Sequence, residues 1–338
     1  MVDLVIPVYK PQEEFVKLLS LIKKQTVKVH KIILMNTEKE YWDEFLGKYK
    51  EVDSYENIEV HHLSKEEFDH GNTRNQGISY SNAEYILLMT QDAIPEDEYL
   101  VENLLQSFEN PKVALAYARQ LPKEDCKEAE KFTRSFNYPE ESRIKSKEDI
   151  ETLGIKAFFC SDVCAMYKRE IFDELGGFIK KTIFNEDAIF ARGALEKGYC
   201  IAYNAKARVV HSHNYSNMEQ FRRNFDLGVS QKQYSEIFEG IKSESEGMKL
   251  VKKTISHLWK NKHKRQILPM IIQSGFMFPR SVTWSQRLMP CIIRRHVPPL
   301  SQKQTDGVLV CSGGPDLKAN RRSLGLLLGT RWGRSYEL

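Results

Sequence analysis

The sequence predicts an α/β fold, a mostly parallel sheet with helices on both faces. Two observations support this. Short apolar runs alternate with helix-period patterns over the first 120 residues, and polar residues follow the runs. The 338 residues are 41% hydrophobic and 28% charged, which excludes a disordered chain. No apolar run approaches the roughly 18 residues of a spanning helix, and the opening MVDLVIPVYK has no signal-peptide pattern. We therefore expect no membrane-spanning segment and no leader.

Five apolar runs in the first 120 residues are predicted strands. They are Asp3–Tyr9, His30–Met35, Ile58–His62, Tyr85–Met89 and Val113–Tyr117. The predicted helices between them contain Phe15–Ile22, Tyr41–Tyr49, Asn72–Ser81 and Glu98–Phe108. Parallel strands need such crossovers, and ligands bind beyond their carboxyl ends. The predicted ligand edge therefore comprises Pro7–Lys10, Asn36–Glu38, Ser64–Arg74 and Thr90–Pro95.

The second half of the chain has a weaker pattern. Residues 122–156 are charged and lack periodicity, so we interpret them as a surface excursion with the character of a mobile lid. Regular structure then resumes in Phe158–Tyr167, Lys168–Leu175, a helix over Glu186–Lys197, and two strands, Cys200–Tyr203 and Arg208–Val210. We predict a domain over 1–225, a basic helical region over 226–300 and an irregular tail over 301–338.

The charge is divided unevenly along the chain. Residues 247–305 carry 12 Lys/Arg and no acid, whereas residues 1–246 have a net charge of −10. Three interpretations of the basic segment stay open: binding to an anionic membrane surface, binding to nucleic acid, and a solvated surface or homo-oligomer contact. No nucleic-acid motif accompanies it, so we expect a membrane surface and no nucleic acid. Six scattered cysteines indicate reduced thiols and a cytoplasmic protein.

The segment FDHGNTRN, residues 68–75, combines an acid, an imidazole, a glycine and a guanidinium at a predicted helix start. A helix N-terminus with a nearby arginine is a natural anion site. The alternative is that Asn72 or Thr73 caps the helix and Arg74 is solvated.

Asp92 follows the fourth predicted strand in TQDAIP. One carboxylate together with ligand phosphates is a common way to hold Mg²⁺ or Mn²⁺. The alternative is a cap for the helix that follows.

Glu186 and Asp187 in FNEDAIF begin a predicted helix. Acids are favoured there by the helix dipole, but one of them could equally act as a general base. In VVHSHNY, His211 or His213 could approach a metal from a strand end, or simply pack. P-loop, GxGxxG and zinc-ligand spacings are absent from the sequence.

Five motifs occur in an informative order: IPVYK, FDHGNTRN, LLMTQDAIP, FNEDAIF and AKARVVHSH. Together they resemble the family 2 glycosyltransferases with the GT-A fold, over roughly residues 1–225. The DHGxTRN and TQDA variants are most similar to bacterial rhamnosyltransferases, which use dTDP-L-rhamnose. The resemblance implies an inverting enzyme that transfers the sugar in one displacement.

The resemblance also implies roles for individual residues. The nucleotide-sugar site would comprise Pro7, Val8, Tyr9, Asn36, Glu38, Asp69, His70, Gly71, Arg74, Gln91 and Asp92. Asp92 stands alone where the family has a DxD, and would hold Mg²⁺ or Mn²⁺ with His211, or with His213 as the alternative. Asp187 would be the catalytic base, with Glu186 beside it.

The implied acceptor is a hydroxyl of a growing, lipid-linked cell-surface polysaccharide at the inner face of the cytoplasmic membrane. Two alternatives stay open. The donor is a UDP-hexose, or the chain is a non-catalytic GT-A-like scaffold in a polysaccharide assembly complex, since the first DxD acid is missing.

Overall fold

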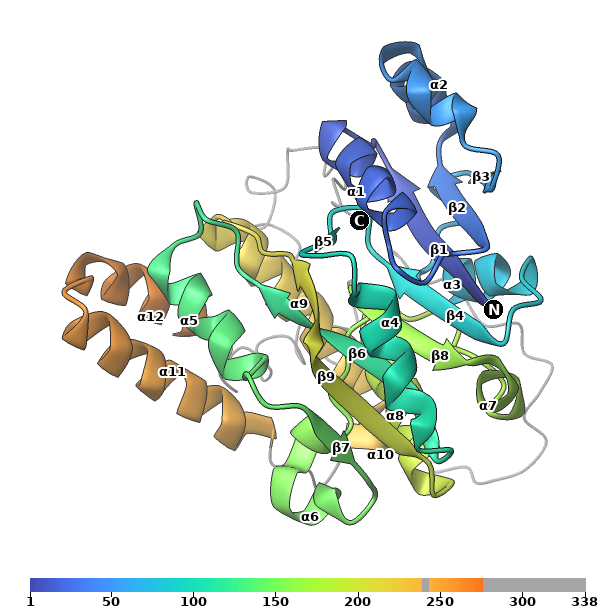
Figure 1. Cartoon of the computed structure of the whole chain (residues 1–338). Coiled ribbons are helices and arrows are strands. Elements are labelled where there is room, and N and C mark those ends of the chain that lie inside the picture. Colours follow the sequence, from blue (N-terminus) through green and yellow to red (C-terminus); the bar gives the residue numbers. More distant parts are fainter. Residues whose placement is uncertain (239–242, 276–338) are drawn as a thin grey trace, which may run out of the picture. The chain divides into compact units, whose positions relative to one another are not determined.

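The described residues of the computed structural model, 1–238 and 243–275, contain a nine-stranded sheet in the order β3-β2-β1-β4-β8-β6-β9-β5, with β7 also paired to β9 (Figure 1). The strands are β1 (Val2–Tyr9), β2 (Lys31–Thr37), β3 (Ile58–Leu63), β4 (Tyr85–Met89), β5 (Ile94–Pro95), β6 (Val113–Leu121), β7 (Arg143–Lys145), β8 (Cys164–Lys168) and β9 (Cys200–Val210). The five predicted N-terminal strands are all present.

Most of these strands run in one direction. β1, β2, β3, β4, β6 and β9 share it, whereas β5, β7 and β8 run opposite. The predicted α/β class with a mostly parallel sheet is confirmed. The exception that matters is β8, which inserts antiparallel between β4 and β6. It brings the loop before it, residues 158–163, to the edge where β4 and β6 end.

Twelve α-helices surround the sheet in the described residues. They are α1 (Glu13–Lys23), α2 (Lys39–Lys48), α3 (His70–Ser79), α4 (Leu100–Gln106), α5 (Glu128–Asn137), α6 (Asp149–Leu153), α7 (Arg169–Glu174), α8 (Glu186–Glu196), α9 (Asn217–Gln233), α10 (Ser235–Phe238), α11 (Ser243–Lys260) and α12 (Ile267–Gly275). Short 3₁₀ turns are η1 (Lys50–Ser54), η2 (Ser107–Glu109), η3 (Gly154–Ala157) and η4 (Lys264–Gln266).

The core lies on both faces of the sheet. In β1, Leu4 and Ile6 face a cluster that includes Phe15 and Leu18 of α1. Val5 faces the opposite cluster, which includes Ile78 of α3. Successive side chains of a strand point to opposite faces, so a strand covered on both sides must be apolar throughout. This explains the uninterrupted apolar run that predicted β1.

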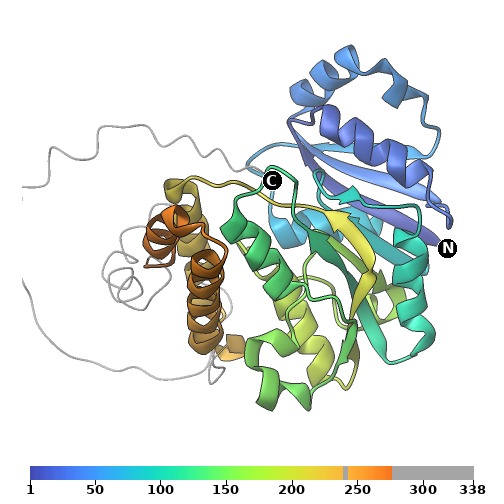
Figure 2. The ribbon, with the colours of Figure 1, turned by 60° about the vertical axis from the view of Figure 1, so that its left-hand side comes forward.

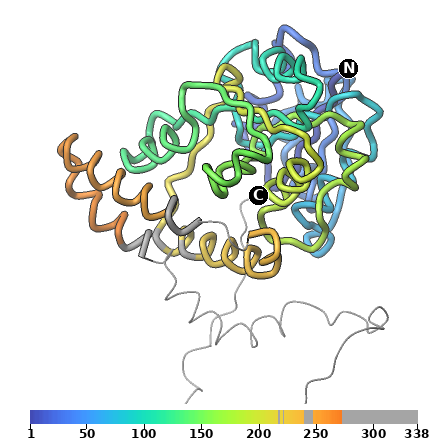
Figure 3. The backbone as a smooth tube through the Cα atoms, turned by 90° about the horizontal axis from the view of Figure 1, so that it is seen from below, coloured from blue at the N-terminus to red at the C-terminus, as the bar shows by residue number. Residues whose placement is uncertain are grey.

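Residues 122–156, which we interpreted as a surface excursion, contain regular structure that the sequence pattern did not predict. They contain α5, β7 and α6, and β7 pairs antiparallel with β9 through Ile144 and Ala202. The charged composition has a structural cause, because α5 packs against α11 through pairs such as Glu128 Oε1–His257 Nε2 at 2.9 Å. Figures 2 and 3 show α5 and α11 side by side. The two short strands predicted over 200–210 are also one strand, β9.

The helices from α9 to α12 belong to the same compact unit as the sheet, Met1–Phe278. The predicted basic region is helical where it is described, up to residue 275, and its part beyond that residue lies outside the described residues, as does the predicted tail over 301–338. The domain limits 1–225 and 226–300 stay predictions. Among the described residues, none of the helices has the length and apolar character to span a membrane.

Candidate active site

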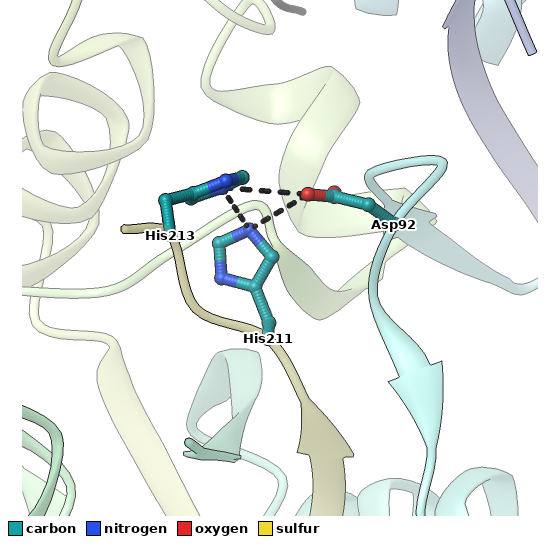
Figure 4. Close-up of side chains that lie close together, drawn as sticks. All are labelled: Asp92, His211 and His213. Carbon is teal, nitrogen blue, oxygen red and sulfur yellow. Dashed lines mark hydrogen bonds and ion pairs between the residues drawn. The ribbon is translucent and has the colours of Figure 1, made fainter. Parts of the chain in front are cut away.

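Three side chains converge where β4 and β9 end (Figure 4). Asp92 lies in the turn between β4 and β5, and His211 and His213 follow β9. Asp92 Oδ2 is 3.4 Å from Nε2 of each imidazole, and the two Nε2 atoms are 3.1 Å apart. The predicted pair Asp92 and His211 therefore meets, and the alternative histidine, His213, joins it. Asp92 does not cap a helix, since β5 follows it.

The electrostatics of this triad, Asp92–His211–His213, are those of a ligand set. Burial alone would raise the pKa of Asp92, but the hydrogen bond and charge of His211, with the charge of His213, lower it well below its ordinary value. Burial, together with the charge of His211, lowers the pKa of His213 to about 4. At neutral pH the triad therefore offers a carboxylate and a neutral His213 imidazole. Carboxylate oxygens and neutral imidazole nitrogens are metal donors, and these ligand atoms lie within 4.8 Å of one another.

A second polar group, the carboxylate cluster, lies behind the start of α8. It consists of Asp162, Glu186, Asp187 and the guanidinium of Arg74. Arg74 Nη1 is 3.0 Å from Glu186 Oε1, and Arg74 Nε is 3.4 Å from Asp162 Oδ2. Arg74 and Glu186 are each 5% exposed. Arg74 is therefore not the solvated side chain of the alternative interpretation, and its role as an anion ligand stays a prediction.

The carboxylate cluster holds three acids against one arginine. Burial, with the charges of Glu186 and Asp162, raises the pKa of Asp187 well above its ordinary value. Burial and Glu186 likewise raise the pKa of Asp162 to about 6, against the opposing charge of Arg74. Asp187 is partly exposed to solvent, whereas Glu186 is buried. A reachable carboxylate with a raised pKa is a suitable proton acceptor.

The loop before β8 connects the carboxylate cluster with the triad. The Asp162 backbone N–H donates to Asp187 Oδ2 at 3.4 Å, and Tyr167 OH donates to Asp162 Oδ1 at 2.6 Å. In the same loop, Ser161 Oγ accepts from Gln120 Nε2 at 3.0 Å. Gln120 Oε1 in turn lies 3.1 Å from Nδ1 of His211. The two polar groups therefore share one framework of hydrogen bonds.

Gln91 joins the ends of β1 and β4. The Tyr9 N–H donates to Gln91 Oε1 at 3.0 Å, and Gln91 Nε2 donates to the Tyr9 carbonyl at 2.9 Å. This reciprocal pair commits both ends of the Gln91 amide to the main chain. Gln91, predicted as a nucleotide-sugar ligand, thus positions the strand end that carries Pro7 and Val8.

The end of β2 presents polar atoms in a buried setting. Asn36 Nδ2 donates to the Glu38 carbonyl at 3.1 Å, while Asn36 Oδ1 and Thr37 Oγ1 are buried without a hydrogen-bond partner. Glu38 Oε1 accepts from the Lys65 N–H at 2.6 Å. Buried polar atoms are normally paired, so the free oxygens of Asn36 and Thr37 are an unusual feature of the ligand edge.

The start of α3 has a different cap from the one that we considered. The cap is Asp69 and not Asn72 or Thr73, because Asp69 Oδ1 accepts a hydrogen bond from the Asn72 backbone N–H at 2.7 Å. The helix itself begins at His70. The His70 carbonyl accepts from Arg74 Nη1 at 2.9 Å. A Cβ on Gly71 would lie 2.1 Å from the Ile179 carbonyl oxygen. Gly71 is therefore required for close packing, and this turn holds Arg74 in the carboxylate cluster.

Asn185 immediately precedes the first residue of α8. Its side chain does not cap α8, and its backbone adopts a left-handed conformation at φ 70°. The side-chain Nδ2 instead donates to Ser230 Oγ of α9 at 2.9 Å. This contact ties the start of α8, and with it Glu186 and Asp187, to the C-terminal helices.

Sequence reasoning missed several residues of this region: Gln120, Arg134, Asp162 and Arg223. The guanidinium of Arg223, on α9, lies 4.9 Å from the ring centre of Tyr215, which in turn stacks on His213 at 4.8 Å. None of the four stands in a recognisable local motif. Only the topology brings them to the edge, so no signal in the sequence alone could have identified them.

A mostly parallel α/β sheet with flanking helices, and with polar side chains gathered at its strand ends, is the architecture of the GT-A glycosyltransferases. Residues 3–176 match the family described as Glycosyl transferase family 2, and the chain belongs to that family. It is a glycosyltransferase, and enzymes of this family invert the anomeric configuration. The family resemblance that the sequence predicted is confirmed.

Two relatives and one solved structure illustrate the similarity. The O-antigen chain rhamnosyltransferase RfbN of Salmonella typhimurium is 38% identical over 264 residues, 77% of this chain and 82% of that protein. The O-antigen chain rhamnosyltransferase WbaN of Salmonella anatum is 42% identical over 203 residues, 59% of this chain and 64% of that protein. The structure of S. aureus TarS 1-349 in complex with UDP-GlcNAc aligns with this chain over 87% of this chain and 78% of the TarS chain, at TM-score 0.52 and 13% identity. A similarity at this identity shows a shared fold alone.

Proposed function

We propose that this glycosyltransferase moves L-rhamnose from dTDP-L-rhamnose to a hydroxyl of a growing, lipid-linked cell-surface polysaccharide. The two O-antigen rhamnosyltransferases at 38% and 42% identity support the sugar and the acceptor class. The observation that carries the chemistry is the convergence of Asp92, His211 and His213 at the edge that the carboxylate cluster also reaches. The S. aureus neighbour was solved with a nucleotide sugar, which supports this donor class.

Asp187 is the proposed general base. Its Oδ1 accepts the Ala188 N–H at 2.7 Å, so the carboxylate has a fixed orientation at the start of α8. It takes the proton of the acceptor hydroxyl while that oxygen attacks the anomeric carbon opposite the leaving diphosphate. The raised pKa of Asp187 makes it a stronger base than an ordinary aspartate. One displacement inverts the configuration without a covalent enzyme intermediate.

Asp92, His211 and His213 are the proposed ligands of a divalent cation. When bound, such an ion would neutralise the charge that develops on the leaving diphosphate. Mg²⁺ prefers oxygen ligands, so two imidazole nitrogens in the donor set favour Mn²⁺ over Mg²⁺. The donor chemistry therefore fits the metal that the missing first DxD acid had put in question.

The leaving diphosphate needs a cation from the protein as well. Arg74 is held by Glu186 and Asp162, so we assign this role to Arg223, whose exposed guanidinium lies over Tyr215 next to His213. The unpaired oxygens of Asn36 and Thr37 are the proposed acceptors for the ring N–H of a thymine or uracil. Tyr9, Val8 and Pro7 would line the base.

The donor is tested with purified protein, Mn²⁺, and dTDP, UDP or GDP in a thermal-shift series, followed by turnover of dTDP-rhamnose and UDP-hexoses. We expect stabilisation by dTDP, about 2.7 kcal/mol at 100 times its dissociation constant, and release of dTDP only when acceptor lipid is present. A response to UDP alone would make the donor a UDP-hexose. No turnover of any donor by folded protein would favour the scaffold alternative.

We also propose that the α11–α12 turn binds an anionic membrane surface. Trp259 is 60% and Leu268 67% exposed, and Lys260, Lys262, Lys264 and Arg265 between them are exposed as well. Each basic residue near an anionic leaflet contributes about 1 kcal/mol, and an exposed tryptophan is suited to the interface. This would place the enzyme peripherally at the cytoplasmic face, where its lipid-linked acceptor lies.

The membrane proposal is tested by flotation with phosphatidylglycerol or phosphatidylcholine vesicles. We expect binding to the anionic vesicles alone, and its loss in a Lys262→Glu/Lys264→Glu double variant. The matched control is Lys48→Glu/Lys50→Glu, which reverses two exposed lysines, one at the end of α2 and one at the start of η1. If both variants lost vesicle binding equally, the binding would depend only on the net charge of the protein, and this turn would have no specific role.

A further inference from the structure

Gln120 lies near the end of β6 with 2% of its surface exposed. Its amide has three partners. Nε2 donates to Ser161 Oγ at 3.0 Å, and Oε1 faces both Nη1 of Arg134 and, at 3.1 Å, Nδ1 of His211. A buried amide surrounded in this way has no freedom to reverse without losing partners. Its orientation therefore dictates what the neighbouring groups can donate or accept.

Arg134 determines that orientation. A guanidinium has donors and no acceptor, so the amide atom that faces Arg134 Nη1 must be the oxygen. Arg134 cannot turn away easily, because Glu130 Oε1 holds its Nε at 2.7 Å one helical turn earlier on α5. The oxygen that accepts from Arg134 is the one that faces His211, and an oxygen only accepts. His211 Nδ1 must therefore carry a proton.

A neutral imidazole with its proton on Nδ1 has a lone pair on Nε2. In His211 this is the nitrogen that lies 3.4 Å from Asp92 Oδ2 and 3.1 Å from Nε2 of His213. The lone pair thus points to the centre of the triad before any ion arrives. A hydrogen bond to the remote ring nitrogen commonly sets the tautomer of a metal-binding histidine in this way.

We propose that Gln120, oriented by Arg134, is a positioning residue that locks neutral His211 in the Nδ1–H tautomer and so presents its Nε2 to a divalent cation. The proposal rests on the proposed function for the ion, but the tautomer itself is a property of the metal-free protein. It also distinguishes the two histidines, because only His211 has this buried partner, as far as the described residues show. His213 must adjust its own proton when the ion binds.

The test is nitrogen-15 NMR of histidine-labelled protein at pH 8 without metal, with His211 assigned by a His211→Gln variant. We expect the wild-type signal pattern of an Nδ1–H imidazole. In Gln120→Leu the acceptor is lost, and the proton should redistribute to Nε2. Gln120→Glu is the matched control, because a carboxylate still accepts from both Arg134 and His211, and it should keep the wild-type tautomer.

Mn²⁺ affinity by calorimetry is the second readout. Gln120→Leu should bind Mn²⁺ about 10–100-fold more weakly, the usual cost of losing such a partner, while Gln120→Glu should not. A wild-type spectrum with the proton on Nε2 would overturn the proposal even if Gln120→Leu fails to fold, and so would unchanged Mn²⁺ affinity in a folded Gln120→Leu. An Nδ1–H signal in wild type without Mn²⁺ binding would instead overturn the metal role in the proposed function.

Discussion

The triad and the carboxylate cluster lie at one edge of the sheet, but they differ in whether the group contains a cation of its own. The carboxylate cluster contains its own cation, Arg74, which is almost fully buried against Glu186 and Asp162. The triad directs Asp92, His211 and His213 at one point without such a cation among them. A cluster that is neutralised from within belongs to the framework and tunes its members, whereas a set of converging donors is completed by a ligand. Four predictions test this difference.

The largest expected effect is on turnover. Asp187→Asn removes the proposed base, and we expect turnover to fall about 10²–10⁴-fold while donor binding is retained. Glu196→Gln is the matched control, because Glu196 lies at the other end of the same helix and pairs only at the surface with Arg192 and Lys147. Steady-state rates and dTDP binding of both variants decide the matter. Wild-type turnover in Asp187→Asn would remove this residue from the role.

The next prediction concerns stability. Arg74→Met leaves three acids without their cation, and removal of one partner from a buried ion pair costs about 3–5 kcal/mol. Denaturant unfolding should show this loss. Asp43→Asn provides the comparison, because it breaks the exposed Lys39–Asp43 pair, where we expect a change of about 0.5 kcal/mol or less. Similar small losses in both variants would mean that Arg74 is not part of the framework.

A substitution in the triad should change the affinity for the metal ion and not the stability of the protein. His211→Asn should lower Mn²⁺ affinity at least as much as the roughly 10–100-fold cost of losing an outer partner, with little change in the unfolding midpoint of the metal-free protein. Calorimetry and unfolding of His211→Asn and His213→Asn, side by side, measure both quantities. If either variant lost stability but kept its Mn²⁺ affinity, that histidine would belong to the framework.

The sequence predicted the triad better than the carboxylate cluster, and the reason is physical. Asp92 and His211 follow apolar runs, and strand ends meet at one edge whatever the rest of the fold does. Asp162 reaches the edge only because β8 inserts antiparallel between β4 and β6, which local periodicity cannot indicate. Gln120 was missed because β6 continues to Leu121, beyond the predicted end at Tyr117.

Composition misled in the same part of the chain. The charged side chains of residues 122–156 were interpreted as a solvated excursion, yet Glu128 pairs with His257 of α11, and Arg134 bonds Glu130 and Gln120. A pattern of charged residues in the sequence does not show whether their side chains face water or another polar surface of the protein. The FDHGNTRN motif likewise marked a real helix start, but Gly71 and Arg74 act inside the protein.

The last prediction concerns the pH dependence of the carboxylate cluster. Burial and Glu186 raise the pKa of Asp162 to about 6, above the 3.8 of an ordinary aspartate. Between these values the unfolded chain has released a proton that the folded protein keeps, so this contribution to the free energy of unfolding is present below pH 3.8 and is lost as the pH rises to about 6.

Asp162→Asn removes that titration, so its stability relative to wild type should rise between pH 4 and pH 6 and level off above. Urea midpoints of both proteins at several pH values measure the difference, which cancels other groups that titrate in the same range, such as His213. A constant difference across this range would show that Arg74 keeps Asp162 ionised throughout. The carboxylate cluster would then contain a fixed Arg74–Asp162 salt bridge, and the charge of Asp162 would contribute to the raised pKa of Asp187 throughout this range.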